Sequence, residues 1–116
     1  MTLQNDSARK AERRRTPRYP FVANAEVSET TSGPRIEGRV SEIGMNGCHV
    51  VTSNPPPEGA KIFLKIFKGT DFLDASATVA YSQPNRGMGL QFRDVNRLFL
   101  PTLQKWLLEA MNAPRA

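Results

Sequence analysis

Four arginines lie close together near the start of the chain, and their spacing is typical of a phosphate-binding segment. The segment ERRRTPRYPF contains Arg13, Arg14, Arg15 and Arg18. A guanidinium is a planar fork of donors that can hold two phosphate oxygens and can also stack on a purine. In an extended chain Arg14 and Arg18 project to the same side, about 13 Å apart. Pro17 favours a bend that brings them together around one ligand, although a solvated basic tail explains the same residues.

A second feature is the turn Glu42-Ile43-Gly44-Met45-Asn46-Gly47, in which two glycines stand three residues apart. Glycine has no Cβ, so it lets a backbone approach a ligand closely or adopt a positive φ. An ordinary hairpin turn uses the same residues. The turn therefore indicates a ligand-binding site only in combination with the arginine segment.

Residues suited to catalysis or metal binding are scarce. His49 is the only histidine and Cys48 the only cysteine, so a four-ligand zinc site of the usual kind cannot be assembled. The chain has no GxSxG elbow and no GxxxxGK(S/T) phosphate loop, and carboxylates such as Glu42 and Asp74 have no paired nucleophile. We therefore expect a protein that is not an enzyme, with no catalytic residues, no metal and no cofactor.

Length and charge indicate one small domain with an anionic partner. A chain of 116 residues can bury one core, whereas two domains would each be marginal. The formal net charge is +5, and more than half of the excess lies in residues 1–20. No run approaches the roughly 20 apolar residues of a membrane helix, no signal-peptide segment is visible, and a lone cysteine is typical of a reducing compartment. We expect a cytoplasmic location without membrane insertion.

The elements that position these residues are predicted to be short strands. Apolar and polar residues alternate with period two, or mix at short period, between clusters of glycine, proline and asparagine. In KIFLKIFK, for example, Ile62, Leu64 and Ile66 alternate with Phe63 and Phe67. The predicted strands cover 19–29, 35–43, 48–53, 61–68, 72–81 and 88–92, with a hairpin turn at 69–71.

The C-terminal residues change to a helical period. Pro101 would break a helix interior, so we expect a short turn over 94–100 and the main helix from Pro101. Six strands followed by one helix predict a mainly-β fold, a six-stranded antiparallel β-barrel with a C-terminal α-helix. Residues 1–11 are polar and without period, and are expected to form a flexible N-terminal arm ahead of a barrel domain over 12–116. The helical period of the C-terminal residues comes from apolar side chains that repeat at three- and four-residue steps, which are Leu98, Leu103, Trp106, Leu107, Ala110 and Met111.

Together these features resemble the PilZ domain family, whose two signatures are RxxxR and, some twenty to thirty residues on, (D/N)xSxxG at a strand–turn–strand junction. Residues 14–18 resemble the first signature and residues 42–47 the second. The run RGMGLQF, residues 86–92, resembles the closing strand of the family. The resemblance covers nearly the whole chain after residue 11. It implies a barrel with a C-terminal helix that acts as a receptor for the bacterial messenger cyclic di-GMP.

The resemblance also implies roles for individual residues. Arg14 and Arg18 would bind phosphate and stack on or hydrogen-bond guanine, with Arg13 as an additional donor. In the family an arginine just before RxxxR accompanies an intercalated ligand dimer, so Arg13 implies two ligands per chain. Tyr81 falls where some members carry an aromatic residue that packs on a guanine, whereas its alternation with Val79 equally places it in the core.

The second signature departs from the family pattern at two positions. Glu42 replaces Asp or Asn, and its longer side chain can still accept hydrogen bonds from guanine N1–H and N2–H₂. Gly44 replaces Ser and so loses a hydroxyl hydrogen bond, a cost of about 1 kcal/mol. Both changes predict weaker binding, while Gly47 matches the pattern. His49 either faces the ligand, where a protonated imidazole favours phosphate, or is a plain exposed strand residue.

Three functions are open at this point. The first is a cyclic di-GMP receptor or adaptor that changes conformation on binding and signals to a protein partner. The second is a degenerate PilZ module with weak or no ligand binding that acts as a protein-interaction adaptor in motility or exopolysaccharide machinery. The third is a nucleic-acid-binding barrel. Against the third, basic and aromatic residues interleave only in residues 61–68, whose phenylalanines can be core residues.

Overall fold

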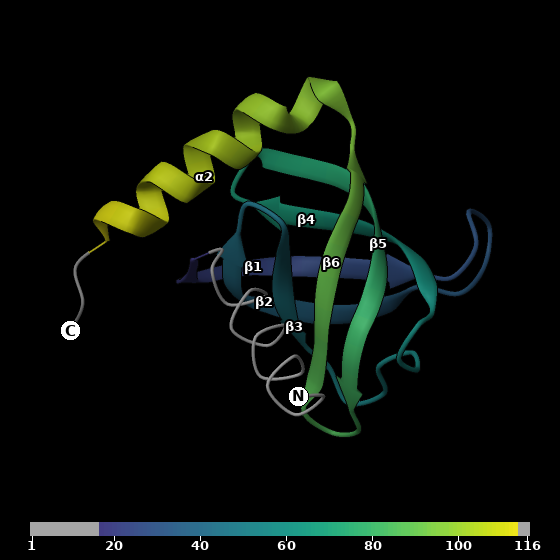
Figure 1. Ribbon diagram of the computed structural model, residues 1–116. Helices are drawn as coiled ribbons and strands as arrows, with labels where there is room; N and C mark the ends of the chain where they lie inside the picture. Colours follow the sequence, from purple (N-terminus) through teal and green to yellow (C-terminus); the bar gives the residue numbers. More distant parts are fainter. Residues whose placement is uncertain (1–16, 114–116) are drawn as a thin grey trace, which may run out of the picture.

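The computed structural model describes residues 17–113 of the chain, and its mainly-β fold confirms the fold class predicted from the sequence. Within these residues, six strands precede a single 3-10 turn, η1, and one α-helix, α2 (Figure 1). Each strand predicted from alternation is present. The elements are β1 Arg18–Ser28, β2 Ile36–Gly44, β3 Gly47–Val51, β4 Lys61–Lys68, β5 Asp71–Gln83, β6 Gly87–Val95, η1 Arg97–Phe99 and α2 Leu100–Asn112.

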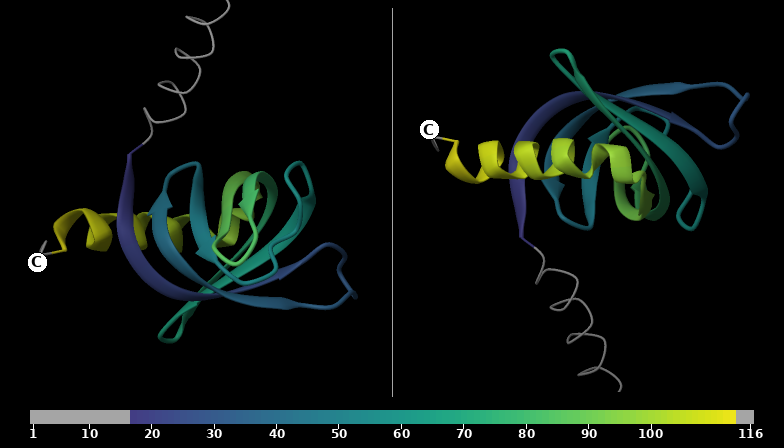
Figure 2. Two further views of the ribbon diagram at one scale, coloured as in Figure 1. Left: turned by 90° about the horizontal axis from the view of Figure 1, so that it is seen from below. Right: turned by 90° about the horizontal axis from the view of Figure 1, so that it is seen from above.

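The six strands pair antiparallel in the order β1-β2-β3-β6-β5-β4, and β4 returns to β1, so the sheet closes into a barrel. Closure removes the free edges that an open sheet would leave. α2 lies across one end of the barrel, and its C-terminal end projects past β1 in both views of Figure 2. Within residues 17–113 the structure contains no helix with the length and apolar character needed to cross a membrane.

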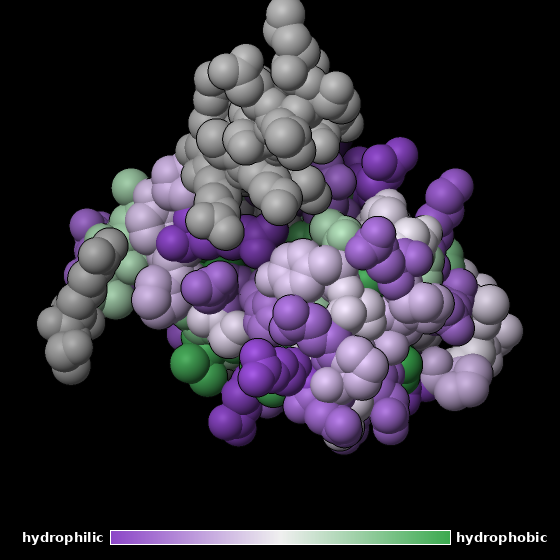
Figure 3. All heavy atoms as spheres, turned by 60° about the horizontal axis from the view of Figure 1, so that its bottom comes forward, coloured by the Kyte–Doolittle hydropathy of each residue, from purple (hydrophilic) through white to green (hydrophobic). Residues whose placement is uncertain are grey.

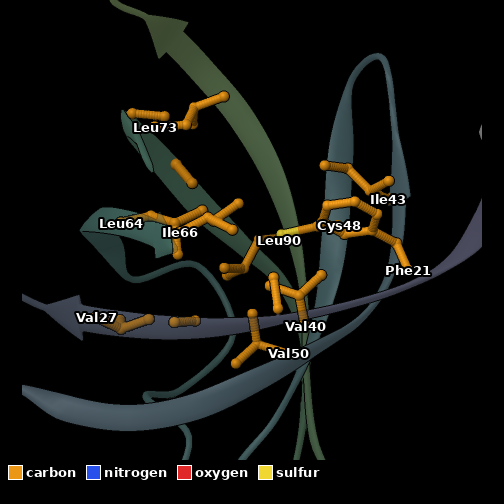
Figure 4. Packing of buried hydrophobic residues seen from close by; sticks show 14 of the residues in the cluster. Phe21, Val27, Val40, Ile43, Cys48, Val50, Leu64, Ile66, Leu73 and Leu90 are labelled. Atoms are coloured by element: carbon orange, nitrogen blue, oxygen red, sulfur yellow. The ribbon is translucent and has the colours of Figure 1, made fainter. Parts of the chain in front are cut away.

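The core follows from strict alternation along the strands. Ile62, Leu64 and Ile66 of β4 are at most 2% exposed, as the period-two pattern predicts. Their neighbour Phe63 consequently points outward and is 45% exposed, so the interpretation of the KIFLKIFK phenylalanines as core residues is wrong. Inward-pointing side chains of the strands meet inside the barrel, as Figure 4 shows.

α2 covers the barrel end with Leu103, Trp106 and Ala110, all of which are buried. The ring of Trp106 lies 5.4 Å from that of Phe21 on β1, measured between centroids. The helix begins at Leu100, one residue before the predicted start, with proline in its first turn. The turn expected over 94–100 is shorter than predicted, because Asp94 and Val95 still pair with β5 and extend β6.

Irregular pairing alters the strands that carry the two predicted signatures. The β1–β2 register shifts between Pro20 and Ala23, and the β2–β3 register shifts between Val40 and Glu42. A bulge of this kind changes which side chains face the core beyond it. Val40 and Ile43 are therefore both buried although they are three residues apart, and the exposed Glu42 lies on the outside.

Candidate ligand-binding site

The predicted site residues that the structure describes lie on one outer wall of the barrel. Arg18 pairs with Gly44, and Glu42 pairs with His49 across β2 and β3. His49 in turn pairs with Gly89 of β6, and Gly89 pairs with Tyr81 of β5. Arg13 and Arg14 fall outside the described residues, so their roles stay predictions. We refer below to the site wall, which consists of Arg18, Glu42, Gly44, Gly47, His49 and Tyr81.

Gly44 and Gly47 are needed because of close backbone packing. Neither has a positive φ, so the conformational freedom of glycine is not used here. A Cβ on Gly44 would lie 2.6 Å from the carbonyl oxygen of Pro17, and one on Gly47 would collide with the carbonyl oxygen of Leu90. Gly44 thus lets the segment leading into Arg18 lie directly against the end of β2. A serine at this position would push that segment away, so the departure from the family signature does more than remove a hydroxyl.

The turn between the two glycines is short and attached to β6. β2 ends at Gly44 and β3 begins at Gly47, leaving Met45 and Asn46 as the two turn residues. The carbonyl oxygen of Asn46 accepts a hydrogen bond of 2.8 Å from the backbone N–H of Phe92. This bond fixes the turn relative to the neighbouring strand, and with it Gly44, whose backbone lies against that of Pro17.

His49 is held by contacts from several strands. Its Nδ1 lies 2.9 Å from the Oγ of Ser41, the residue at the irregularity in β2. Its ring stacks on that of Tyr81, with centroids 6.0 Å apart and planes at 27°. A Cβ on Gly89 would collide with the Tyr81 ring, so this glycine lets the ring lie against β6. The two rings form what we call the aromatic platform, His49 and Tyr81.

The orientation of Tyr81 resolves one alternative left open by the sequence. Tyr81 is 38% exposed, whereas Val79 is 1% exposed. Pairing between β5 and β6 shifts between these two residues, which turns the tyrosine out of the alternation that would have buried it. The core interpretation of Tyr81 is therefore wrong, and its stacking on guanine stays a prediction.

The electrostatics of His49 bear on one of the two alternatives that the sequence left open. Burial lowers the pKa of His49 from 6.5, the carboxylate of Glu42 raises it, and the guanidinium of Arg18 lowers it. The lowered pKa favours the neutral imidazole at pH 7, which disagrees with the alternative in which a protonated ring binds phosphate. A neutral ring suits the platform, since it can stack on a planar base and still exchange a hydrogen bond with Ser41.

Cys48, next to His49, faces the core and is fully buried. Burial raises the pKa of the Cys48 thiol to about 12, with Arg18 acting in the opposite direction. The thiol is therefore uncharged and unreactive at neutral pH. Its contribution to the site is to anchor β3 to the core, so that His49 faces outward.

The arrangement combines a cation, a carboxylate and an aromatic surface. Arg18 can hold an anion, Glu42 can accept from N–H donors, and the platform can take a planar base. The face at the bottom of Figure 1, turned forward in Figure 3, is mostly hydrophilic. No group of three or more His, Cys, Asp and Glu side chains that could hold a metal occurs in the described part of the chain. The chemistry available is the binding of a polar, anionic, planar ligand.

Sequence reasoning missed two members of this arrangement. Ser41 orients the His49 ring, and Gly89 makes room for Tyr81. Ser41 gave no signal of its own, because its contact depends on the bulge. Gly89 did carry one: a glycine inside an alternating strand often marks a close approach by another group.

Comparison with known proteins gives a consistent result. The profile of the PilZ domain family matches residues 12–109. No curated protein matches the sequence. The solved PilZ domain of YcgR from Escherichia coli with c-di-GMP has a TM-score of 0.68 and 13% identity, covering 85% of this chain and 92% of that one.

A second solved structure is that of the Bacillus subtilis inhibitor of motility, MotI/DgrA. It has a TM-score of 0.67 and 19% identity over 88% of this chain, which spans about half of that protein, 53%. At these identities the structural likeness shows the fold. The family profile covers most of the sequence, and the barrel with its C-terminal helix agrees with it, so the chain belongs to the PilZ domain family.

Proposed function

We propose that this chain is a cyclic di-GMP receptor that binds the nucleotide on the site wall and passes the signal to a protein partner. The observation that carries the proposal is the meeting of Arg18, Glu42 and the aromatic platform on one wall, next to the turn that forms the second signature. The fold neighbour YcgR was solved with c-di-GMP, which supports the choice of ligand.

Each part of the wall matches one part of the nucleotide. The guanidinium of Arg18 would hold a phosphodiester, with Arg14 and Arg13 as further donors from the preceding segment. The carboxylate of Glu42 would accept from guanine N1–H and N2–H₂. The platform, whose imidazole is neutral, would stack on a guanine plane, an interaction that contributes about 1–3 kcal/mol per base.

A route for the signal runs along β1. Arg18 begins this strand, and Phe21, three residues on, packs against Trp106 of α2. Phe21 also lies at the register shift between Pro20 and Ala23. A ligand that fixes the arginine segment would therefore act on the strand that supports the helix. The fold neighbour named as an inhibitor of motility supports an adaptor role in motility.

The degenerate adaptor is the second candidate, and Glu42 favours it. A longer carboxylate must lose more rotamer freedom to reach guanine than an aspartate would. Gly44 does not favour this candidate in the same way, because its lack of a Cβ lets Pro17, the residue before Arg18, lie against the end of β2.

Isothermal titration with cyclic di-GMP tests the proposal on the wild-type chain, Arg18→Ala and Arg14→Ala. We expect saturable binding that falls at least tenfold in either variant, since a charge-assisted hydrogen bond contributes about 1.5–3 kcal/mol. Arg97→Ala removes an equal charge from η1, outside the site wall, and should leave affinity unchanged.

Other outcomes of the same titration separate the candidates. Absence of any binding to the wild type would contradict the receptor proposal and favour the degenerate adaptor. Tight, strongly salt-dependent binding of a single-stranded oligonucleotide would indicate the nucleic-acid-binding barrel. Two ligands per chain would support the role predicted for Arg13, and one ligand would contradict it.

A further inference from the structure

A groove of about 510 Å³ lies on a different part of the barrel from the site wall. It runs over the outer faces of β1, β4 and β5 to the end of β6, and residues of the β1–β2 loop contribute to one side. None of the residues of the site wall lines it. A cavity of this size is in the range of sites that hold one or two side chains or a small ligand.

Three residues form a row across the middle of this groove. Phe63 of β4 pairs with Ser76 of β5, and Ser76 pairs with Asp94 of β6. Neighbouring strands are about 4.8 Å apart, so the backbones of Phe63 and Asp94 are separated by about 10 Å. Ser76, which lies between them, has one of the smallest side chains. The row is thus a slot with an aromatic ring at one side, a carboxylate at the other and a serine as its floor.

The charges in the groove leave one carboxylate available. Arg35 Nη1 lies 2.8 Å from Glu26 Oε1, and Lys65 Nζ lies 3.8 Å from Asp74 Oδ1. Both cations that line the groove are therefore matched by a carboxylate. Asp94, which is exposed, has no side-chain hydrogen bond and no ion pair among the residues that the structure describes. The groove is on balance acidic, in a chain whose formal net charge is +5.

A guanidinium fits this slot better than other common groups. It can stack on the face of Phe63, which is 45% exposed, and donate two parallel hydrogen bonds to the carboxylate of Asp94. An ammonium is a compact point charge without the planar fork, so it would make fewer of these contacts at once. We propose that the Phe63–Ser76–Asp94 slot binds an arginine side chain presented by a segment of a partner protein.

Nucleic acid is the main alternative occupant, because Lys61, Phe63 and Lys65 alternate basic and aromatic side chains on the outer face of β4. The carboxylates of Asp74 on β5 and Asp94 on β6 line the same groove and would repel a phosphate backbone. The proposal does not depend on cyclic di-GMP, since the slot and the site wall share no residue.

The test is a titration of the ¹⁵N-labelled chain with the peptide acetyl-Gly-Arg-Gly-amide, followed by amide chemical shifts. We expect saturable shifts centred on Phe63, Ser76 and Asp94, with a dissociation constant in the millimolar range, on the order of 4 kcal/mol of binding free energy. The same peptide with lysine should bind at least threefold more weakly, and one with citrulline, the neutral isostere of arginine, at least tenfold more weakly.

Two surface variants and one matched control complete the experiment. Asp94→Asn and Phe63→Ala should each weaken binding of the arginine peptide at least threefold. Glu58→Gln removes the same charge from the exposed loop before β4 and should have no effect. The spectra themselves report whether each variant is folded. Shifts absent from the groove, equal binding of the lysine peptide, an equal loss in Glu58→Gln, or stronger shifts of these amides by an oligothymidine would each overturn the proposal.

Discussion

The groove and the site wall belong to the same barrel, but irregular strand pairing is more frequent beside the site wall. β4 and β5 pair without a shift from Lys61 opposite Thr78 to Lys68 opposite Asp71. The site wall, in contrast, lies beside register shifts in β1–β2, β2–β3 and β5–β6. Continuous pairing sets side chains in straight rows, such as Phe63 opposite Ser76 on β4 and β5, while the other side of Ser76 borders a single shift in the β5–β6 pairing. Irregular pairing turns selected side chains outward and makes a convergent site.

Glycine adds to this difference. Gly44 and Gly47 on the site wall, and Gly89 beside it, each occupy a position where a Cβ would meet a backbone oxygen or an aromatic ring. The shape of the site wall therefore depends on the missing Cβ atoms of these glycines as much as on the side chains that are present. Substitutions that add one carbon should consequently have large effects there and small effects along the regular rows.

The largest expected effect comes from Gly44→Ser, which restores the family signature. The added Cβ would lie 2.6 Å from the Pro17 carbonyl oxygen, so it should displace the segment that leads into Arg18. We expect cyclic di-GMP affinity to fall at least tenfold, and the free energy of unfolding to fall by about 1–3 kcal/mol through overpacking. Titration calorimetry and urea unfolding measure the two effects. Tighter binding in this variant would mean that the lost hydroxyl matters more than the packing.

A smaller loss is expected from Gly89→Ala. The methyl group would collide with the Tyr81 ring and separate it from His49. Affinity for cyclic di-GMP should fall about fivefold, at the lower end of the 1–3 kcal/mol that stacking contributes. Tyr81→Ala should cost a similar amount, and the double variant should cost no more than either single one. Additive losses in the double variant would show that Gly89 does not act through Tyr81.

A modest dependence of stability on pH should arise from His49. Its pKa in the folded chain lies below 6.5, so between these two values the unfolded chain binds a proton that the folded chain does not. The contribution to stability is therefore complete above pH 6.5 and is lost as the pH falls through the folded pKa. Thermal unfolding at pH 7 and pH 5.5 should show a smaller difference for His49→Gln than for the wild type, and equal differences would contradict this account.

The smallest effect is expected in the groove, on β4, where strand pairing is continuous. Phe63→Ala removes a half-exposed ring from the outer face of β4. Affinity for cyclic di-GMP should stay within twofold of the wild type, and the free energy of unfolding should change by about 0.5 kcal/mol or less. A large loss of cyclic di-GMP binding would show that the two regions are coupled or that the nucleotide uses the groove.

The same contrast explains what the sequence could and could not predict. Where pairing is continuous, as in β4, alternation correctly separated Ile62, Leu64 and Ile66 from the phenylalanines, and it left open which of the two sets faces the core; the first set is buried. Where pairing shifts, alternation failed, and Tyr81 could not be assigned to either face. A bulge depends on how two strands meet, and that information is not local in either one.

The site shows the same limit. The resemblance of residues 14–18 and 42–47 to the two PilZ signatures identified a candidate site before any fold was known, since both signatures are short and local. The packing of Gly44 against Pro17 joins residues far apart in the chain, so a missing serine was interpreted only as a lost hydrogen bond. Likewise, burial and neighbouring charges set the protonation of His49, and neither can be obtained from its position in the sequence.

The most direct test of the central claim is a map of amide chemical shifts on titrating the ¹⁵N-labelled chain with cyclic di-GMP. The account predicts saturable shifts at Arg18, at residues 42–47, at His49 and at Tyr81, while Phe63, Ser76 and Asp94 stay unchanged. Shifts confined to the groove, or no shifts at ligand concentrations that saturate another PilZ receptor, would contradict it.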